Sequence, residues 1–244
     1  MAILTRLSPN SSLLTTPIAH RGLHSDAVPE NSLPAFEWAI ACGLPIECDV
    51  HLLADGALAV FHDFELARMT GDIRNLNEIG AGEAVRLRLN GSNETIPLLG
   101  DLLDLVHGKV PLLIELKEKI WSGNLEDFVV KALSHYSGEF AVQSFNLESI
   151  LWLKNNAPEI CRGQLSGGER GVQHYAATEP DFVADEIGSL PHADTTRLRN
   201  RGLPLLAWTI SNTAEQARAA ELADNYIFNW NEELHDSLGL AAMK

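Results

Sequence analysis

Cysteines and long apolar runs are scarce in this chain of 244 residues. Its three cysteines, Cys42, Cys48 and Cys161, include no Cys-x-x-Cys pair. An odd, sparse count excludes a disulfide scaffold and indicates a reducing compartment, where such thiols pack as small apolar side chains. No run approaches the ~18 apolar residues of a membrane span, and the N-terminal residues form no apolar stretch of signal-peptide length. The sequence therefore predicts a soluble, cytoplasmic protein.

Positive charge is also in short supply. The chain has 18 Lys and Arg residues against 33 Asp and Glu residues, a net charge of −15 with histidine taken as neutral. Such a surface repels nucleic acid and anionic lipid headgroups, so neither is expected as a partner. The apolar fraction, 45%, is that of an ordinary globular protein with a real core. An anionic substrate would need positive groups or a metal ion in its site.

Short apolar runs alternate with helix-like segments along almost the whole chain, and no linker rich in Gly, Ser or Pro divides it. We therefore expect one domain over residues 1–244. A turn at Asp55-Gly56 predicts a hairpin between the second and third strands. The pattern predicts strands at 17–20, 45–50, 57–62, 110–116, 140–144, 160–165, 182–185, 203–208 and 226–228, and helices at 31–42, 125–136, 147–155, 213–222 and the C-terminal end.

Alternating strands and helices indicate a parallel sheet, and about eight units in a chain of this length favour a (β/α)8 TIM barrel. A doubly wound open sheet is the alternative, but no Gly-x-Gly-x-x-Gly follows the first strand. Residues 70–97 have weak periodicity and are expected to form loops inserted over the C-terminal face of the barrel. Gly167-Gly168 is not followed by a Walker lysine and hydroxyl, so a phosphate cradle is not expected there.

Acidic residues stand inside two predicted strands. Glu47 and Asp49 are two residues apart and so leave the same face of their strand. Two bare carboxylates are costly to bury, so either a cation lies between them or they are ion-paired acids at a strand end. Glu115 lies in an otherwise apolar run, with Lys117 on the same face. Three carboxylates would form an oxygen-rich site suited to Mg²⁺ or Ca²⁺, with Lys117 binding a substrate anion or neutralising Glu115.

Two histidines, His20 and His62, end predicted strands. Residues at the C-terminal ends of barrel strands are typical of catalytic positions, because the loops there build the active site. One such histidine is more often structural, but two beside three carboxylates favour a catalytic role. Arg21, next to His20, offers a planar fork that can hold two phosphate oxygens.

An ordered set of motifs resembles the glycerophosphodiester phosphodiesterase family. The resemblance spans the chain from Ile18 to about Asn229, and the set is specific although no single piece is decisive. It rests on Ile18-Ala-His-Arg-Gly22, Pro29-Glu-Asn-Ser32, Ala35-Phe36, Glu47-Cys-Asp-Val50, Asp55-Gly56, Phe61-His-Asp63, Ile114-Glu-Leu-Lys117, Gln143-Ser-Phe145 and Trp208-Thr209.

The resemblance implies a (β/α)8 barrel of the phospholipase C-like phosphodiesterase type that hydrolyses glycerophosphodiesters to glycerol 3-phosphate and an alcohol. It implies metal ligation by Glu47, Asp49 and Glu115, with one Mg²⁺ or Ca²⁺. It further implies that His20 and His62 form the acid/base pair and that Arg21 and Lys117 contact the phosphate. Phe145 and Trp208 would form an apolar wall for the glycerol. Glu30 and Asn31 match a motif near the site and are expected to support it.

Two departures from the family pattern stand out. Asn229-Trp-Asn231 replaces the Asp, aromatic and Pro often found near the last strand, and the loop around His24 has no clear counterpart. The substrate preference of this loop's site can therefore differ from that of the family. Lysophospholipids and cyclic phosphodiesters are alternative substrates that need a wider apolar mouth, which residues 70–97 would have to form. His51 shares the face of Glu47 and Asp49 but lies nearer a turn, and we do not place it among the ligands. A non-catalytic phosphate-ester-binding protein is a further alternative, but it would not need two histidines and three carboxylates.

Overall fold

The computed structural model describes residues 6–118, 121–168 and 172–240, with only the backbone at 172–174. Within these ranges, eight parallel strands close into a barrel, because β1 pairs with both β9 and β2. This confirms the expected (β/α)8 fold and excludes an open doubly wound sheet. The strands of the barrel are β1 (Ile18–Ala19), β2 (Ile46–Leu52), β4 (Leu112–Leu116), β5 (Phe140–Ser144), β6 (Arg162–Ser166), β7 (Phe182–Glu186), β8 (Leu205–Ile210) and β9 (Asn225–Phe228).

The remaining strand, β3 (Leu58–Val60), is antiparallel to β2, as the Asp55-Gly56 turn predicts. Its register places Val60 opposite Val50, so the chain after β3 runs back beside β2. The sequence had suggested that His62 ends a barrel strand. In the structure it instead follows the antiparallel strand β3. It reaches the same region because the hairpin folds back on β2.

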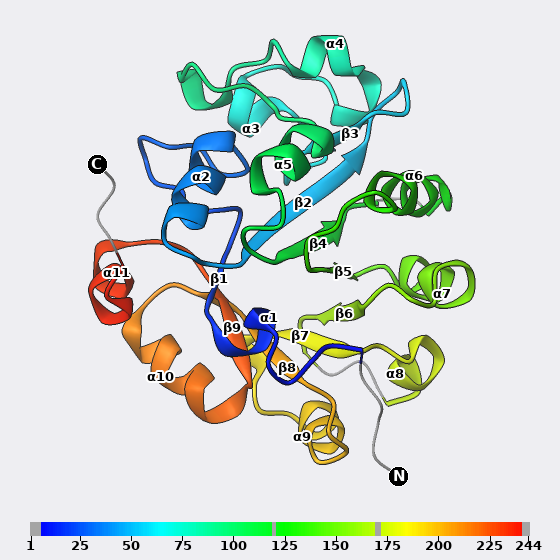
Figure 1. Ribbon diagram of the computed structural model, residues 1–244, viewed down its shortest axis with the longest axis vertical. Helices are drawn as coiled ribbons and strands as arrows, with labels where there is room; N and C mark the ends of the chain where they lie inside the picture. Colours follow the sequence, from blue (N-terminus) through cyan, green and yellow to red (C-terminus); the bar gives the residue numbers. More distant parts are fainter. Residues whose placement is uncertain (1–5, 119–120, 169–171, 241–244) are drawn as a thin grey trace.

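Helices surround the barrel and cover the outward faces of its strands (Figure 1). Residues 99–106 form an amphipathic helix that buries Leu99, Leu102 and Val106, although the sequence analysis expected no helix there. The helices are α2 (Leu33–Ala41), α5 (Leu99–Val106), α6 (Asn124–Leu133), α7 (Leu147–Asn156), α8 (Val172–Thr178), α9 (Ala193–Arg199), α10 (Thr213–Leu222) and α11 (Glu232–Leu238), with a 3-10 turn, η3 (Ile187–Ser189), before α9.

Two apolar clusters hold the barrel together. A large cluster fills the layer between the strands and the helices, where outward-facing residues such as Cys48 and Val50 are fully buried. A second cluster fills the barrel interior, where Phe182 and Leu206 pack with Leu13 of the short helix α1 (Ser12–Thr15). Helix α1 covers the amino-terminal end of the barrel, where Asn225 at the start of β9 donates hydrogen bonds to the carbonyl oxygens of Leu13 and Thr16.

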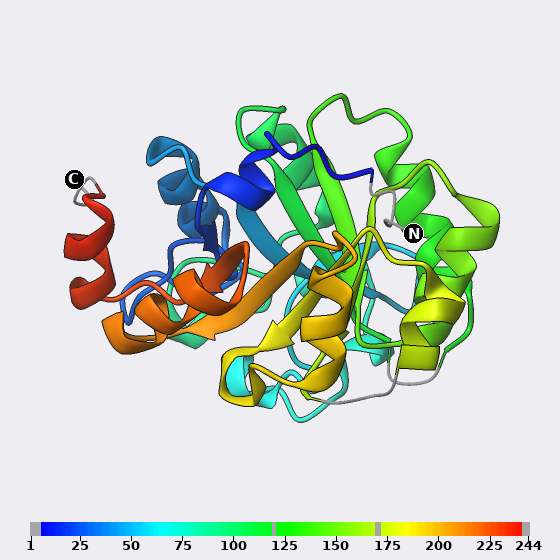
Figure 2. The ribbon, with the colours of Figure 1, turned by 90° about the horizontal axis from the view of Figure 1, so that it is seen from below.

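The segment between β3 and α5 lies at the end of the barrel opposite α1 (Figure 2). Loops were expected over 70–97, but the segment also contains short helices that enclose their own apolar cluster, which includes Leu66, Met69, Leu76 and Ile96. The short helices are α3 (Ala67–Thr70), η1 (Leu76–Glu78), α4 (Ala81–Ala84) and η2 (Leu89–Gly91). This third cluster anchors the segment beside the mouth of the barrel.

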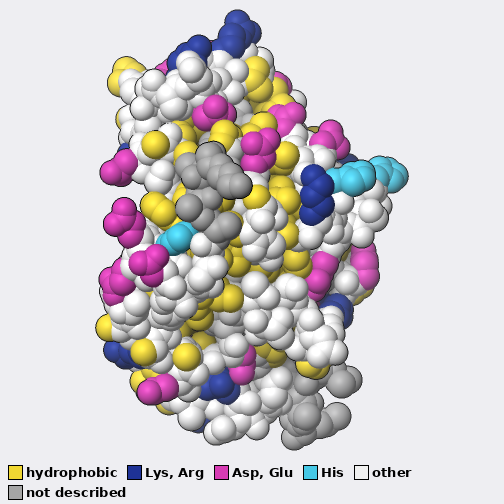
Figure 3. Space-filling model, turned by 60° about the vertical axis from the view of Figure 1, so that its left-hand side comes forward, with side chains coloured by type: hydrophobic (Ala, Val, Ile, Leu, Met, Phe, Trp, Pro, Cys, Tyr) yellow, Lys and Arg dark blue, Asp and Glu magenta, His cyan; other side chains and the backbone are white. Residues whose placement is uncertain are grey.

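The state of the cysteines and the spread of acidic side chains over the surface agree with what the amino-acid composition predicts. The three cysteines, all among the described residues, are free thiols. Within the described ranges no helix is long and apolar enough to cross a membrane. The absence of a signal-peptide stretch was inferred partly from residues 1–5, which lie outside the described ranges. On the face shown in Figure 3, Asp and Glu side chains are spread over the surface among apolar ones.

The loop after β1 depends on the absence of a side chain at Gly22. Gly22 has a φ of +77°, and a Cβ there would lie 2.7 Å from the carbonyl carbon of Ala35 and 2.8 Å from its oxygen. The same loop holds Arg21 at a φ of 55°, also in the left-handed region. The close approach to α2 therefore fixes the backbone from which His20 and Arg21 project.

We expect Gly22→Ala to lower the free energy of unfolding by about 2–4 kcal/mol, because it adds left-handed backbone strain to a clash with main-chain atoms. Gly100→Ala is the matched control, since a Cβ at Gly100 meets nothing within 4 Å. Gly100 lies inside α5, so this change should be neutral or stabilising by up to about 1 kcal/mol. Urea denaturation of both variants measures the difference. Equal stabilities would show that Gly22 is not required for the loop.

Candidate active site

Inward-facing residues change from apolar to acidic and basic toward the carboxyl ends of the strands. On β4, Leu113 belongs to the interior apolar cluster, and Glu115 stands two residues further along. Glu115 is in register with Asp49 on β2 and Gln143 on β5. The polar layer therefore spans neighbouring strands at the end of the barrel that α1 leaves open.

A cavity of about 90 Å³ opens at this end. Eight of the nine site residues predicted from the sequence line it, and Asp49 lies beside it in contact with Arg21 and Lys117. The structure thus brings the whole predicted set together. The lining residues are His20, Arg21, Glu47, His62, Glu115, Lys117, Gln143, Phe145, Leu165, Trp208, Thr209 and Ile227.

Three buried carboxylates form the centre of the site. Glu47 and Asp49 are each 1% exposed and Glu115 is 7% exposed. Each offers an oxygen atom, and these oxygens all lie within 4.8 Å of one another. Two oxygens bound to one Mg²⁺ or Ca²⁺ ion at about 2.0–2.6 Å can be at most about 4–5 Å apart, so the spacing suits a shared cation.

Two basic side chains offset part of this negative charge. The Nζ of Lys117 is 2.7 Å from Glu115 Oε1 and 3.2 Å from Asp49 Oδ1. The Nε of Arg21 is 3.3 Å from Asp49 Oδ2, and the backbone N–H of Arg21 donates a hydrogen bond to Glu47 Oε2 at 3.1 Å. Three carboxylates against two cations leave one negative charge in excess.

The pKa values of the three carboxyl groups shift in different directions. Burial raises the pKa of Glu47 well above its usual value, and the nearby Asp49 and Glu115 carboxylates raise it further. Burial also raises the pKa of Glu115, although Lys117 opposes the shift. Burial would raise the pKa of Asp49 as well, but Lys117 and Arg21 bring it below the usual value. Asp49 therefore forms ion pairs with both Lys117 and Arg21, whereas Arg21 and Lys117 only partly offset the rise in the pKa of Glu47.

The two histidines have different hydrogen-bond partners. His20 Nδ1 donates to Asn229 Oδ1 at 2.6 Å, which leaves His20 Nε2 facing Glu47 Oε2 at 3.9 Å. His62 Nδ1 donates to Asp63 Oδ1 at 2.6 Å. Burial, followed by the charge of Arg21, lowers the pKa of His20 to about 3, and burial also lowers the pKa of His62. One histidine thus has a neutral amide behind it and the other a carboxylate.

Residues of the Pro29–Ser32 motif support the site from behind, as expected. Asn31 is buried with a left-handed φ of 54°, and its Nδ2 donates to Asp49 Oδ2 at 2.8 Å. The Arg21 Nη1 donates to Glu30 Oε1 at 2.7 Å. Glu30 and Asn31 therefore orient one basic and one acidic group of the site.

Two aromatic side chains form the apolar side of the cavity. Phe145 and Trp208 meet edge to face, with ring centroids 5.5 Å apart. Phe145 is 39% exposed, and Trp208 is only partly buried. They come from the ends of β5 and β8, so this apolar wall is assembled from strands far apart in the sequence.

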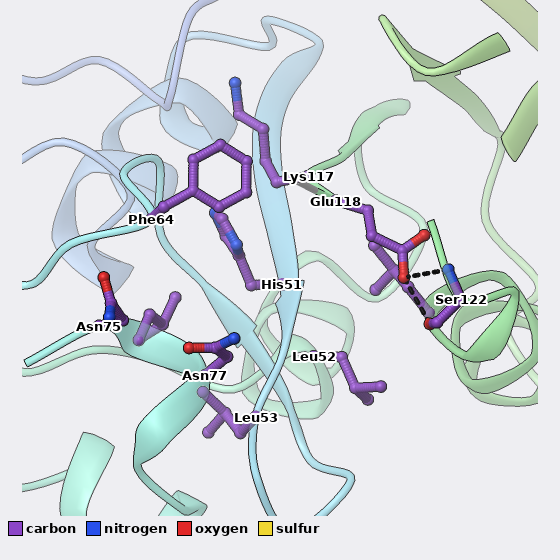
Figure 4. A pocket seen from close by; sticks show the side chains of 11 residues that line it. His51, Leu52, Leu53, Phe64, Asn75, Asn77, Lys117, Glu118 and Ser122 are labelled. Carbon is purple, nitrogen blue, oxygen red and sulfur yellow. Dashed lines mark hydrogen bonds between the residues drawn. The ribbon is translucent and has the colours of Figure 1, made fainter. Parts of the chain in front are cut away.

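A second and larger cavity, about 430 Å³, adjoins the first at Lys117 (Figure 4). His51 lines this cavity rather than the smaller one, and its Nε2 is 3.1 Å from the carbonyl oxygen of His62. Its ring meets Phe64 edge to face at 5.1 Å. His51 therefore packs beside the site instead of joining the carboxylates, as its place near the turn indicated.

Four residues to which the sequence assigned no role either line the small cavity or belong to the hydrogen-bond network around it: Gln143, Asp63, Arg68 and Asn229. Gln143 is 1% exposed, lines the smaller cavity and has an unpartnered side-chain oxygen. Asp63 and Asn229 each stood in a segment noted for its motif. Arg68 carried no sequence signal, because its contacts join loops that only the fold brings together.

The chain matches the model of the glycerophosphoryl diester phosphodiesterase family over residues 20–228. It is 34% identical to a glycerophosphodiester phosphodiesterase of Caldanaerobacter subterraneus subsp. tengcongensis over 84% of this chain and 89% of the relative. It is 24% identical to a glycerophosphodiester phosphodiesterase of Bacillus subtilis over 94% of this chain and 87% of the relative.

Solved structures show the same fold. An Oleispira antarctica phosphodiesterase in complex with the product sn-glycerol-3-phosphate matches with a TM-score of 0.85 and 22% identity, covering 94% of this chain and 100% of that one. A Thermotoga maritima glycerophosphodiester phosphodiesterase matches with a TM-score of 0.74 and 22% identity, covering 86% and 92%. The family model spans most of the chain, and with the 34% identical relative it shows that this protein belongs to the glycerophosphoryl diester phosphodiesterase family of phosphoric diester hydrolases.

Proposed function

We propose that this chain hydrolyses glycerophosphodiesters to glycerol 3-phosphate and an alcohol, using one divalent cation and two histidines. The observation that carries the proposal is the convergence of three buried carboxylates, two basic side chains and two histidines on one small cavity. The Oleispira antarctica phosphodiesterase of the same fold was solved with sn-glycerol-3-phosphate, which supports this choice of product. The alternative of a non-catalytic binding protein leaves the carboxylates and histidines without a purpose.

The donor set fits a hard divalent cation, Mg²⁺ or Ca²⁺. We assign Glu47, Asp49 and Glu115 as its ligands, since their oxygens lie within 4.8 Å of one another and no His or Cys belongs to the group. Arg21 and Lys117 only partly offset the burial and repulsion that raise the pKa of Glu47, and a divalent cation would supply further positive charge there. A divalent cation and a singly charged phosphodiester together would also balance the excess negative charge.

Charge on the phosphate is met from two sides. When bound, the cation polarises the phosphoryl group and offsets negative charge that builds on its oxygens. Arg21 and Lys117 present fixed positive charge from the loop after β1 and from the end of β4. They stabilise the same charge in the transition state, in a buried setting where electrostatic interactions are strong.

The hydrogen-bond partners divide the two histidines between the two proton transfers. His20 is held by the neutral Asn229 amide with Nε2 unprotonated, and it accepts a proton from the attacking hydroxyl or water. His62 is held by the Asp63 carboxylate, which stabilises an imidazolium, and it donates a proton to the leaving alkoxide. Sequence alone left this assignment open.

The aromatic wall is assigned to the glycerol. Phe145 and Trp208 line the cavity with apolar edges and faces, and they bind the carbon chain rather than the phosphate. The larger cavity beside Lys117 is lined by both polar and apolar side chains. It therefore gives no specific support to lysophospholipids or cyclic phosphodiesters over glycerophosphodiesters.

Removal of the metal should abolish turnover, and Mg²⁺ or Ca²⁺ should restore it. Glu47→Gln should weaken binding of the metal ion by more than the ~10- to 100-fold that loss of an outer-shell partner costs, measured by calorimetry in the absence of substrate. Glu221→Gln, which removes an exposed carboxylate on α10, should leave metal binding unchanged. Full activity in excess EDTA, with the protein shown to be metal-free by elemental analysis, would contradict the metal assignment.

Substitution of either histidine should reduce kcat far more than it raises KM. We expect losses of ~10²–10⁴-fold for His20→Ala and His62→Ala, as for other acid/base groups, with the exposed His135→Ala as the control. A p-nitrophenyl leaving group needs no proton, so His62→Ala should lose much less with a glycerol p-nitrophenyl diester than with an alkyl diester. His20→Ala should lose activity with both. The reverse pattern would exchange the two roles.

Truncation of Arg21 and Trp208 should separate phosphate binding from glycerol binding. Arg21→Ala should lower kcat/KM by similar factors for glycerophosphodiesters and for an aryl phosphodiester without glycerol. Trp208→Ala should cost on the order of 1–3 kcal/mol with the glycerol substrates and largely spare the aryl one. Equal losses with both substrates, together with a lower Tm, would instead make Trp208 a structural residue.

A further inference from the structure

Arg68 lies in α3, in the segment between β3 and α5, and its side chain is 47% exposed. It is not among the residues that line the small cavity. Nevertheless, its guanidinium contacts two carboxylates from different loops. One is Glu30, in the loop after β1, and the other is Asp63, just after β3.

Both contacts use two nitrogens of the same guanidinium. Nη2 and Nη1 of Arg68 donate to Glu30 Oε1 at 2.6 Å and Oε2 at 3.1 Å. Nε and Nη2 donate to Asp63 Oδ2 at 2.6 Å and Oδ1 at 3.1 Å. A planar fork that meets two carboxylates in this way fixes their relative orientation, which a lysine ammonium cannot do.

Each of these carboxylates also accepts a hydrogen bond from a residue of the proposed active site, through one of the two oxygens that Arg68 contacts. Glu30 Oε1 accepts from Arg21 Nη1 at 2.7 Å. Asp63 Oδ1 accepts from His62 Nδ1 at 2.6 Å. Arg68 is therefore connected to Arg21 through Glu30 and to His62 through Asp63. One continuous chain of hydrogen bonds to charged groups links the three residues.

Without Arg68, Glu30 would keep only Arg21 as a cationic partner, and Asp63 would keep only its hydrogen bond to His62. Arg21 divides its guanidinium between Glu30 and Asp49, so a mobile Glu30 would leave it free to move toward Asp49 and away from the phosphate. Asp63 would be free to rotate, and His62 would lose the fixed direction of its Nδ1–H bond. Small displacements of this kind are costly, because a misplacement of about 1 Å can reduce a rate ~10²-fold.

We propose that Arg68 is a positioning residue that sets Arg21 and His62 relative to each other through Glu30 and Asp63. The inference rests on the proposed function of these two residues. It gives the segment between β3 and α5 a part in the reaction, since α3 would lock the loop after β1 to the loop after β3.

The chain offers a matched control in the same segment. Arg74 is 41% exposed, and its guanidinium likewise contacts two carboxylates, Asp72 and Glu83. Those carboxylates are not among the residues that line the small cavity. Arg68→Gln and Arg74→Gln therefore remove similar surface ion pairs, and only the first removes a link to the site.

We expect Arg68→Gln to lower kcat for an alkyl glycerophosphodiester by ~10- to 100-fold, with metal binding unchanged and a smaller loss for the p-nitrophenyl diester, because His62 is displaced. Arg68→Lys should recover only part of the loss, and Arg74→Gln should retain full activity. Adding Asp63→Asn to Arg68→Gln should cost less than the product of the two single losses. The ring-nitrogen NMR signals of His62 should change in Arg68→Gln and stay unchanged in Arg74→Gln.

Wild-type activity in the same assay separates the two ideas. A wild-type protein that cleaves neither diester would overturn the proposed function, and the NMR signals of His62 would still decide whether Arg68 positions it. An active wild type, with Arg68→Gln equal to Arg74→Gln in kcat and in the His62 signals, would overturn the positioning role alone. The positioning role would also be overturned if the loss of kcat in Arg68→Gln were fully explained by a lower Tm.

Discussion

The burial of three carboxylates at the open end of the barrel is the constraint on which the rest of the site depends. Glu47, Asp49 and Glu115 are nearly inaccessible to water, and their mutual repulsion would be very costly without positive charge. Arg21 and Lys117 form ion pairs with Asp49, and Lys117 also contacts Glu115, while the two cations only partly offset the repulsion at Glu47. Three carboxylates with this spacing can hold a metal ion, in a protein with a net charge of −15.

The fold concentrates these charges by separating the two ends of the barrel. Apolar side chains such as Phe182 and Leu13 fill the interior toward the amino-terminal end, and the three clustered carboxylates lie further along the strands, toward their carboxyl ends. The hairpin of β2 and β3 then folds back and delivers His62 to the same place. The small apolar cluster after β3 holds α3, and with it Arg68, against the loops that carry Glu30 and Asp63.

Much of the architecture could be predicted because it follows local patterns. Strand β5, expected at 140–144, and helix α10, expected at 213–222, agree with the structure, because β5 begins with a short apolar run and α10 is rich in Ala and Glu, which favour helices. Helices α5, α8 and α9 were missed. In α5 the buried residues Leu99, Leu102 and Val106 do follow a helical spacing, but the run is only two turns long. The short helices of 70–97 escaped for the same reason, since a few residues carry no periodicity.

The sequence by itself determined the barrel and the kinds of side chain in the site. The reason is that alternating strands and helices, and carboxylates inside apolar runs, can be recognised in the sequence alone. It could assign Glu47, Asp49 and Glu115 to one centre, because parallel strands bring their carboxyl ends to one edge. Only the tertiary structure decided the partner of each side chain: Asn229 for His20, and Arg68 behind Asp63. The physical reason is that hydrogen bonds and ion pairs depend on distances of about 3 Å between residues far apart in sequence, and no spacing along the chain encodes them.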